Sequence, residues 1–319
     1  MKKSIFAFAA ALAALVACNK NEATPMQPQY QESLVPCELT VGICGAMTKA
    51  TAVSADNEAK VNNLQVFVFR GDDLDAYASV DNAQELTLSC TAGDRVVYAL
   101  VNAPDYSAVP GKAALLAKVS ELSANSLSNF EMVGSKSVTL PQSEKVSIDV
   151  NRIASRVVLK KITRNFTSEA LQALNFKVDA IYLINVAGNT SYDLSAAPAK
   201  WYNVAENKNE LASLLYDAPA SLITNGQSYS TTHTFYAYPN DLATNTTRLV
   251  IETTLGETKY YYPINLPEMA ANKSYEIEEV KITRPGSDNP DEPVSFADAT
   301  FSINVIDWTV VPVTEGTTI

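Results

Sequence analysis

The sequence contains little histidine and little glycine, and each shortage excludes a class of site. His233 is the only histidine among 319 residues, so HExxH zinc sites and histidine-rich metal clusters cannot be formed. The 11 glycines form neither a dinucleotide-binding motif nor a P-loop. Because no nucleophile–base pair or metal cluster can be named either, we expect a protein that is not an enzyme and holds no metal or cofactor.

Basic residues are also in short supply. The 24 lysines and arginines are outnumbered by 35 aspartates and glutamates, which gives a formal net charge of −11. Phosphate binding requires a basic surface, so a nucleic-acid partner is excluded. The hydrophobic fraction of 47% is enough to build a sizeable core, and a chain of 319 residues fits roughly two domains of ordinary size.

The first eighteen residues have the pattern of a bacterial lipoprotein signal. A basic start, Met1–Lys3, precedes an apolar run over Ile5–Val16 that is too short to span a bilayer of ~30 Å as a helix. The run ends in Leu-Val-Ala-Cys, a lipobox, which predicts cleavage between Ala17 and Cys18 and acylation of Cys18, for example with palmitate. The alternative is an ordinary signal peptide in which Cys18 has no role.

After Cys18 the chain is predicted to be a polar tether up to Ser33, and no later stretch is long and apolar enough for a transmembrane helix. Three further cysteines, Cys37, Cys44 and Cys90, form no CxxC motif. An odd, scattered set of cysteines is a poor basis for a disulfide framework. We therefore interpret these three as small buried hydrophobic residues.

From Leu34 onward, apolar and polar residues alternate with a period of two between turn residues, which is typical of half-buried strands. Many such segments predict an all-β fold with few short helices, arranged as two β-sandwich domains in tandem over residues 50–150 and 151–319. Helical spacing predicts helices over Lys112–Leu127 and Glu206–Leu215. Val138–Leu140 and Val146–Val150 are predicted to pair as a hairpin.

Five features follow one another along the chain. They are Ala17–Lys20 at the lipobox, Val61–Phe69 before a glycine, Cys90–Gly93 leading into Val97–Asn102, the proline-rich segment Pro285–Pro293, and Phe301–Val305 with Trp308 near the end. In this order they resemble the Bacteroidales fimbrillin family, the major and minor shaft subunits of type V pili. The likeness covers nearly the whole length, and it depends on the order of the segments rather than on any one of them.

The resemblance implies transthyretin-like β-sandwich domains and a structural role as a pilin. Such pilins are exported as outer-membrane lipoproteins, cut by a trypsin-like protease and assembled into an extracellular fimbrium for adhesion. The cut removes the first strand of the N-terminal domain, and the C-terminal strand of a neighbouring subunit fills the groove by strand addition. The implied partners are further copies of this subunit, anchor and tip proteins, the maturation protease, the outer membrane, and receptors on host or bacterial surfaces.

Carried over to this sequence, the resemblance implies a removable propeptide over residues 18–49 with its strand at Glu38–Met47. The protease is expected to cut between Lys49 and Ala50, in a turn-prone stretch of small residues, with Lys60 as the second candidate. Family members usually have arginine at this place, so the lysine leaves the identity of the protease open.

The predicted donor strand is residues 300–313. Its apolar side chains form two sets that face opposite ways: Phe301, Ile303 and Val305 in one, and Ile306, Trp308 and Val310 in the other. Burial of three to five such side chains contributes ~1.5–3 kcal/mol each, which is enough for a durable linkage. A free donor strand and a cleavable first strand together favour a shaft subunit, while anchor and tip roles stay open.

A second hypothesis is a monomeric surface lipoprotein that binds glycan or another ligand. Tyr260, Tyr261 and Tyr262, among 15 tyrosines, would then belong to an aromatic binding platform. A strand whose rings alternate between a buried and an exposed face explains the same residues. A first strand that stays in place in the working protein would favour this hypothesis.

Overall fold

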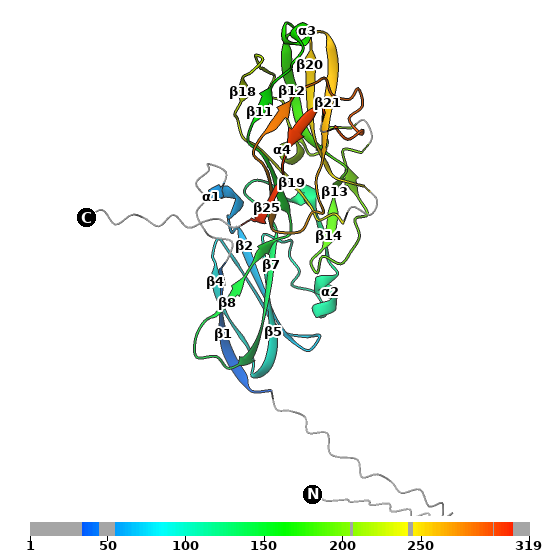
Figure 1. The fold of residues 1–319 in the computed structure, drawn as a ribbon. Coiled ribbons are helices and arrows are strands. Elements are labelled where there is room, and N and C mark those ends of the chain that lie inside the picture. Colours follow the sequence, from blue (N-terminus) through cyan, green and yellow to red (C-terminus); the bar gives the residue numbers. More distant parts are fainter. Residues whose placement is uncertain (1–33, 45–54, 205–206, 242–244, 296, 309–319) are drawn as a thin grey trace, which may run out of the picture. The chain divides into compact units, whose positions relative to one another are not determined.

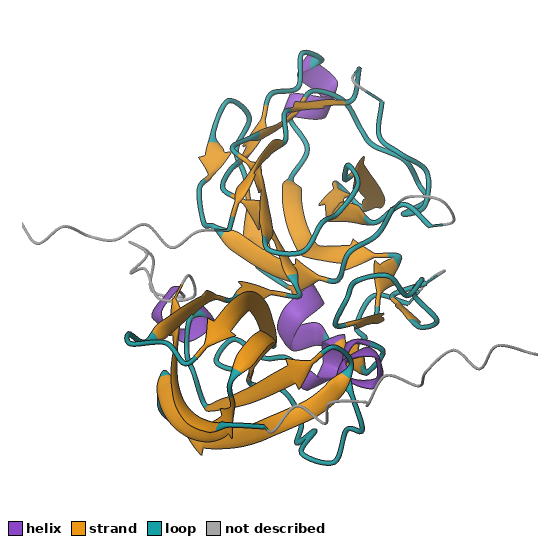
Figure 2. Ribbon diagram, turned by 90° about the horizontal axis from the view of Figure 1, so that it is seen from below, coloured by secondary structure: helices purple, strands orange, loops and turns teal. Residues whose placement is uncertain are grey.

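The computed structural model describes residues 34–44, 55–204, 207–241, 245–295 and 297–308. Strands dominate these residues and the helices are short, as Figure 2 shows. The predicted all-β class with few short helices is therefore confirmed. Five of the predicted site residues lie outside the described ranges, namely Ala17, Cys18, Lys49, Ala50 and Val310.

The N-terminal β-sandwich has two sheets (Figure 1). The first has the order β4-β1-β8 and contains β1 (Pro36–Cys44), β4 (Glu85–Thr91) and β8 (Val146–Asp149). The second has the order β3-β2-β5-β7-β9 and contains β2 (Asn63–Arg70), β3 (Asp73–Asp81), β5 (Gly93–Val101), β7 (Met132–Leu140) and β9 (Asn151–Arg152). Neighbouring strands are antiparallel except β1 and β8, which are parallel.

Alternation along these strands places one face of each sheet in a shared apolar core, because successive side chains of a strand point to opposite faces. This N-terminal core consists of Leu39, Val41, Leu64, Val66, Val68, Leu88, Cys90, Val97, Ala99, Val101, Met132, Leu140, Val146, Ile148 and Val150. Phe67 and Phe69, on the other face of β2, belong to a second core. The strand β2 is therefore buried on both faces, which explains its continuous apolar sequence.

Four long strands of the C-terminal β-sandwich are each interrupted once, which divides one sheet into two short sheets. The strands follow the same order across both sheets, because β18 and β19, β10 and β11, β22 and β23, and β24 and β25 are consecutive along the chain. The sheet β19-β10-β22-β25 contains β10 (Ser155–Leu159), β19 (His233–Ala237), β22 (Lys273–Ile277) and β25 (Asn304–Asp307). The sheet β18-β11-β23-β24 contains β11 (Ile162–Arg164), β18 (Ser228–Tyr229), β23 (Val280–Ile282) and β24 (Ala299–Phe301).

A further sheet, β16-β12-β20-β21, completes this sandwich. It contains β12 (Phe176–Ile184), β16 (Tyr216–Asp217), β20 (Arg248–Leu255) and β21 (Thr258–Asn265), and β17 (Ser221–Leu222) also pairs with β12. Its inward side chains and those of the interrupted sheets form a large C-terminal core, which includes Ile181, Ile251 and Tyr275. The two β-sandwiches in tandem agree with the predicted architecture.

The remaining elements are small. They are β6 (Val119–Glu121) paired with β14 (Asn189–Ser191), β13 (Val186–Ala187) paired with β15 (Trp201–Tyr202), the helices α1 (Ala55–Glu58), α2 (Lys112–Leu116), α3 (Glu169–Gln172) and α4 (Ala212–Leu215), and the 3-10 turn η1 (Leu122–Ala124). Because β6 pairs with β14, backbone bonds join residues on both sides of position 150, and the domain boundary predicted there stays a prediction. Within the described residues, no helix is long and apolar enough to cross a bilayer.

Three local predictions are wrong in detail. The helix predicted over Lys112–Leu127 is limited to α2, because the chain then extends into β6 to pair with a strand some seventy residues later. The helix predicted over Glu206–Leu215 is present as the single turn α4. The predicted hairpin is absent, since β7 pairs with β5 and β9 whereas β8 pairs with β1 in the opposite sheet.

Candidate functional site

The strand β1 is the middle strand of its sheet (Figure 1). It runs antiparallel to β4, with Pro36 opposite Thr91 and Gly42 opposite Glu85. It also runs parallel to β8 over Val41–Cys44. In the described part of the chain, β4 and β8 have no other strand partner, so the sheet exists only while β1 lies between them.

The inward side chains of β1 form part of the N-terminal core. Leu39 is 1% exposed and Val41 is fully buried, while Cys37 and Ile43 are half-buried against the same core. Glu38 lies on the opposite face and is exposed. The predicted removable strand is therefore present, and it closes one side of the core to solvent.

A buried acidic side chain fastens β4 to the second sheet. The carboxylate of Asp75, on β3, accepts hydrogen bonds from the backbone N of Thr91 at 2.9 Å and from the Thr91 hydroxyl at 2.6 Å. The Nε of Arg95 forms an ion pair with Asp75 at 3.0 Å, and both side chains are less than a tenth exposed. Burial acts to raise the pKa of Asp75, but the hydrogen bonds from Thr91 and the charge of Arg95 outweigh it and hold the pKa below its ordinary value.

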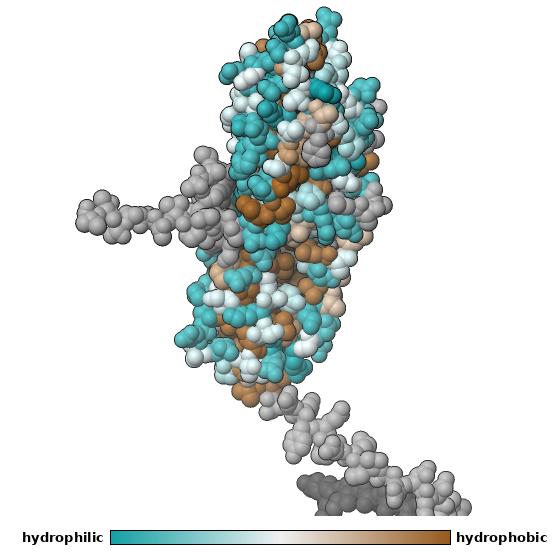
Figure 3. Space-filling model, in the orientation of Figure 1, coloured by the Kyte–Doolittle hydropathy of each residue, from teal (hydrophilic) through white to brown (hydrophobic). Residues whose placement is uncertain are grey.

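The predicted donor region begins as two short strands of the C-terminal domain. Phe301 of β24 and Ile303 are half-buried against the C-terminal core. Val305 and Ile306 of the edge strand β25 are 48% and 47% exposed, and Figure 3 shows hydrophobic residues at the position of β25. An edge strand with exposed apolar side chains is a site where another chain can add.

Trp308 follows β25 and is buried in a socket of charged and aromatic residues. It is 1% exposed, and its indole Nε1 donates a hydrogen bond to the carboxylate of Glu58 at 3.1 Å. The guanidinium of Arg152 lies 4.5 Å from the centre of the Trp308 ring. The rings of Phe130 and Tyr236 lie 5.5 and 5.6 Å from it.

Glu58 is the centre of this socket and is itself fully buried. Its carboxylate accepts a hydrogen bond from the Tyr236 hydroxyl and forms an ion pair with Arg156 at 3.0 Å, while its backbone oxygen accepts a bond from the Nε of Arg152 at 3.1 Å. Burial lowers the pKa of Arg152 to about 10, although the charge of Glu58 acts in the opposite direction. The socket thus joins the helix that follows the predicted cleavage site to the residue that ends the described chain.

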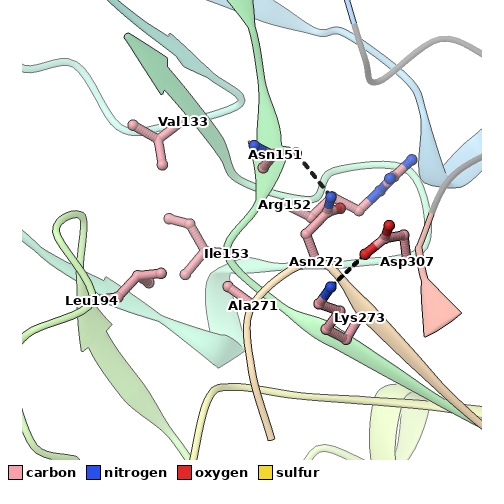
Figure 4. A pocket seen from close by; sticks show the side chains of 9 residues that line it. All are labelled: Val133, Asn151, Arg152, Ile153, Leu194, Ala271, Asn272, Lys273 and Asp307. Carbon is pink, nitrogen blue, oxygen red and sulfur yellow. Dashed lines mark hydrogen bonds and ion pairs between the residues drawn. The ribbon is translucent and has the colours of Figure 1, made fainter. Parts of the chain in front are cut away.

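A shallow hollow of about 370 Å³ lies beside the socket of Trp308. Figure 4 shows its lining, where Lys273 and Asp307 form an ion pair and the side-chain amide of Asn272 donates to Asn151 at 2.8 Å. The ion pair fastens the end of β25 to β22.

The structure brings together Phe301, Ile303, Val305, Ile306 and Trp308, but in unequal environments. Val305 and Ile306 are both exposed and, as neighbours on β25, point to opposite faces. Because Val310 lies outside the described residues, the two predicted sets of apolar side chains stay a prediction. Sequence reasoning missed the socket of Glu58, Arg152 and Arg156. Two arginines four positions apart in an otherwise apolar strand region were the available signal for part of it.

No group of three or more potential metal ligands lies together in the described residues. Every aromatic side chain in the described residues is buried or half-buried. Tyr260 and Tyr261 are half-buried and Tyr262 is buried. The described surface therefore offers no platform of exposed rings for a glycan.

Two family models match the sequence. The model described as "Major fimbrial subunit protein (FimA)" matches residues 38–160, and the model described as "Fimbrium tip subunit Fim1C-like, C-terminal domain" matches residues 153–272. No curated protein matches the sequence.

Solved structures share the fold. A protein of Bacteroides eggerthii described in terms of cell adhesion has a TM-score of 0.69 at 21% identity, covering 88% of this chain and 98% of its own. The fimbrilin FimA of Porphyromonas gingivalis has a TM-score of 0.63 at 17% identity, covering 86% and 98%. The tip fimbrial protein Mfa3 of the same species, truncated at its C-terminus, has a TM-score of 0.53 at 13% identity, covering 86% and 100%.

These structural likenesses are below 25% identity and show the fold. The family is shown by the two sequence models, which both describe fimbrial subunits and together extend over residues 38–272. The chain belongs to the fimbrillin family.

Proposed function

We propose that this fimbrillin is a shaft subunit of a protease-activated fimbrium. In this proposal it is exported as an outer-membrane lipoprotein through Cys18, is cut between Lys49 and Ala50, and polymerises by donor-strand exchange for adhesion. The position of β1 carries the proposal. It is the middle strand of its sheet, yet it precedes Lys49, so a single cut separates it from the rest of the chain.

Loss of β1 would open a slot that favours a replacement strand. The backbone groups of β4 and β8 would lose their ladder partners, and the core would lose the Leu39 and Val41 side chains. Each such side chain contributes about 1.5–3 kcal/mol when buried, and a strand added to open edges restores the backbone hydrogen bonds. The bonds between Asp75 and Thr91 would hold β4 in place while the slot is empty.

The socket around Trp308 indicates which part of the predicted donor strand can move to a neighbouring subunit. Moving the whole of the predicted donor, residues 300–313, would remove Trp308 from contacts with Glu58 and Arg152. Emptying an aromatic site of this kind costs about 3–5 kcal/mol. We therefore assign the transferred strand to Val310 and the other residues after Trp308, with Phe301 to Trp308 remaining in their own domain as its root.

The test uses the full-length chain with Cys18→Ser, kept in a reductant so that its cysteines stay thiols and treated with a trypsin-like protease. The expected result is a new N-terminus at Ala50 and a ladder of polymers on a denaturing gel. Lys49→Ala should abolish both, whereas the matched control Lys60→Ala should not. A chain ending at Trp308 should be cut but stay monomeric.

Two outcomes under these reducing conditions would contradict the proposal: polymerisation of the chain that ends at Trp308, or a cleaved protein that keeps β1 and remains monomeric. The second of these would support the alternative of a monomeric ligand-binding lipoprotein. Polymers formed by the cleaved chain alone indicate a shaft role, whereas a cleaved chain that only terminates polymers of another subunit would indicate a tip role.

A further inference from the structure

The register of the first sheet places two cysteines directly opposite each other. Cys37 on β1 pairs with Cys90 on β4, and their Sγ atoms lie 3.7 Å apart. Opposite residues of an antiparallel pair have Cα atoms about 4.5–5.5 Å apart, which lies within the range that a disulfide spans. Rotation of the two thiols toward each other can therefore close a bond without a change of register.

The other described cysteine cannot compete for this pairing within one chain. Cys44 lies at the far end of β1, seven residues from Cys37, which corresponds to about 23 Å along a strand. Its thiol donates instead to the Oδ1 of Asp149 on β8 at 3.0 Å. The pair is therefore specific, although the chain has an odd number of cysteines after Cys18.

We propose that Cys37 and Cys90 form a disulfide in the precursor and that this bond ties the removable strand β1 to β4. The thiolate of Cys37 attacks one sulfur of a disulfide-carrying oxidant, which forms a mixed disulfide and releases a thiolate. The Sγ of Cys90, after losing its proton, attacks the Cys37 sulfur and releases the second thiolate. Two protein thiols are thereby oxidised, and the oxidant disulfide is reduced to two thiols.

The burial of Cys90 determines when this oxidation can occur. Its side chain is 5% exposed in the folded protein, and burial, with the hydrogen bond to Cys37, raises the pKa of its thiol to about 12. Since the thiolate is the attacking species, oxidation belongs to the folding phase, while β1 and β4 are still open to the oxidant. In the folded protein Cys90 is buried whereas Cys37 is half-buried, so a reductant reaches the bond from the side of Cys37.

The consequence for assembly rests on the proposed function. A cut after Lys49 would leave β1 covalently attached through Cys37, so the slot would stay filled until a dithiol reductant opened the bond. The disulfide would thus prevent strand exchange in a chain that has been cut too early.

The test uses the full-length chain with Cys18→Ser, refolded either with a mixture of oxidised and reduced glutathione or with dithiothreitol. After denaturation and alkylation, mass spectrometry is expected to find two protected thiols in the glutathione sample, with the peptides of Cys37 and Cys90 linked and Cys44 alkylated. Cys37→Ala should abolish the link, and the matched control Cys44→Ser should retain it. Three alkylated thiols in the parent protein refolded with glutathione, or a link through Cys44, would overturn the proposal, whereas the dithiothreitol sample should give three alkylated thiols.

A second readout separates this inference from the proposed function. After treatment with the trypsin-like protease, the oxidised sample is expected to retain the fragment ending at Lys49 on a non-reducing denaturing gel and to form no polymer. Reductant should release the fragment and restore the ladder. If the linked peptides are found but no cut occurs at Lys49, the disulfide stands and the proposed function fails. If the fragment is tied by the disulfide and polymers still form, the blocking role is wrong.

Discussion

The indole Nε1 of Trp308 donates a hydrogen bond to the Oε2 of Glu58 at 3.1 Å, although 250 positions separate the two residues in the sequence. Glu58 belongs to α1, nine residues after Lys49, and Trp308 directly follows β25. The contact therefore lies inside the subunit that would remain after cleavage. It connects the region next to the predicted cut with the root of the predicted donor.

Replacement of Trp308 by alanine is expected to destabilise the protein by about 3–5 kcal/mol, because it empties a buried aromatic site. Urea unfolding measures this change, and Trp308→Phe separates the lost hydrogen bond from the lost packing. The control is Val305→Ala on the exposed part of β25, which should change the free energy of unfolding by no more than about 0.5 kcal/mol. Equal effects at both positions would show that Trp308 is not an anchor.

Removal of the charge of Glu58 is expected to be as costly. Glu58→Gln keeps the size of the side chain but leaves Arg156 without its closest carboxylate and Arg152 without a nearby negative charge. Breaking a buried ion pair in this way costs about 3–5 kcal/mol of unfolding free energy. Glu278→Gln, at a pair that is 54% exposed on the glutamate side, is the control and should have little effect in the same urea titration.

The hydrogen bonds that Asp75 accepts from Thr91, together with its ion pair with Arg95, should give the fold a pH dependence on the acid side. The pKa of Asp75 is lowered from 3.8 in the folded protein, so the unfolded chain binds more protons between the folded and the unfolded value. The stability that Asp75 contributes is therefore complete above the unfolded pKa and is lost as the pH falls through the folded pKa.

Asp75→Asn is expected to lower the free energy of unfolding at pH 7 by about 3–5 kcal/mol and to flatten this acid-side dependence. Urea titrations at a series of pH values from neutral to strongly acidic measure both effects. Asp105→Asn is the comparison, because Asp105 is an exposed residue that does not contact Thr91. A parent protein and an Asp75→Asn variant with parallel pH profiles would contradict the assignment.

Gly134 on β7 allows β8 to approach closely. A Cβ atom added at this position would lie 2.1 Å from the backbone oxygen of Asp149. Because that neighbour is backbone, Gly134→Ala must shift β8, which forms one side of the proposed slot. We expect a loss of stability and a faster release of β1 after cleavage, measured by hydrogen exchange of β1. An unchanged exchange rate with normal stability would show that the approach of β7 to β8 does not matter.

Local sequence patterns predict where a strand lies, but they do not predict which strands it pairs with. The alternation of Leu39 and Val41 with polar residues correctly predicts a half-buried strand, but it does not show that β1 is a middle strand with β8 in parallel. The pairing of β6 with β14 likewise depends on residues far away, so the spacing of leucines after Lys112 predicts too long a helix. Non-local pairing decided these cases.

The candidate site also depends on contacts between residues that are far apart in the sequence. An odd cysteine count argues against a disulfide framework, whereas only the register of β1 on β4 shows that Cys37 faces Cys90. The socket of Trp308 combines residues from α1, β9, β10 and β19, and no spacing in the sequence connects them. Sequence patterns could predict which segments are apolar but not which distant segments meet.

The slot that β1 occupies has one antiparallel wall, β4, and one parallel wall, β8. A replacement strand inserted in the reverse direction would again have one wall of each kind, so backbone bonding discriminates only weakly between the two insertions. The forward insertion keeps the longer ladder antiparallel, which is slightly more stable per residue. The direction in which a donor strand enters this slot would therefore depend mainly on a distance. This is the distance between Trp308 of the donating subunit and the nearer end of the slot in the receiving subunit.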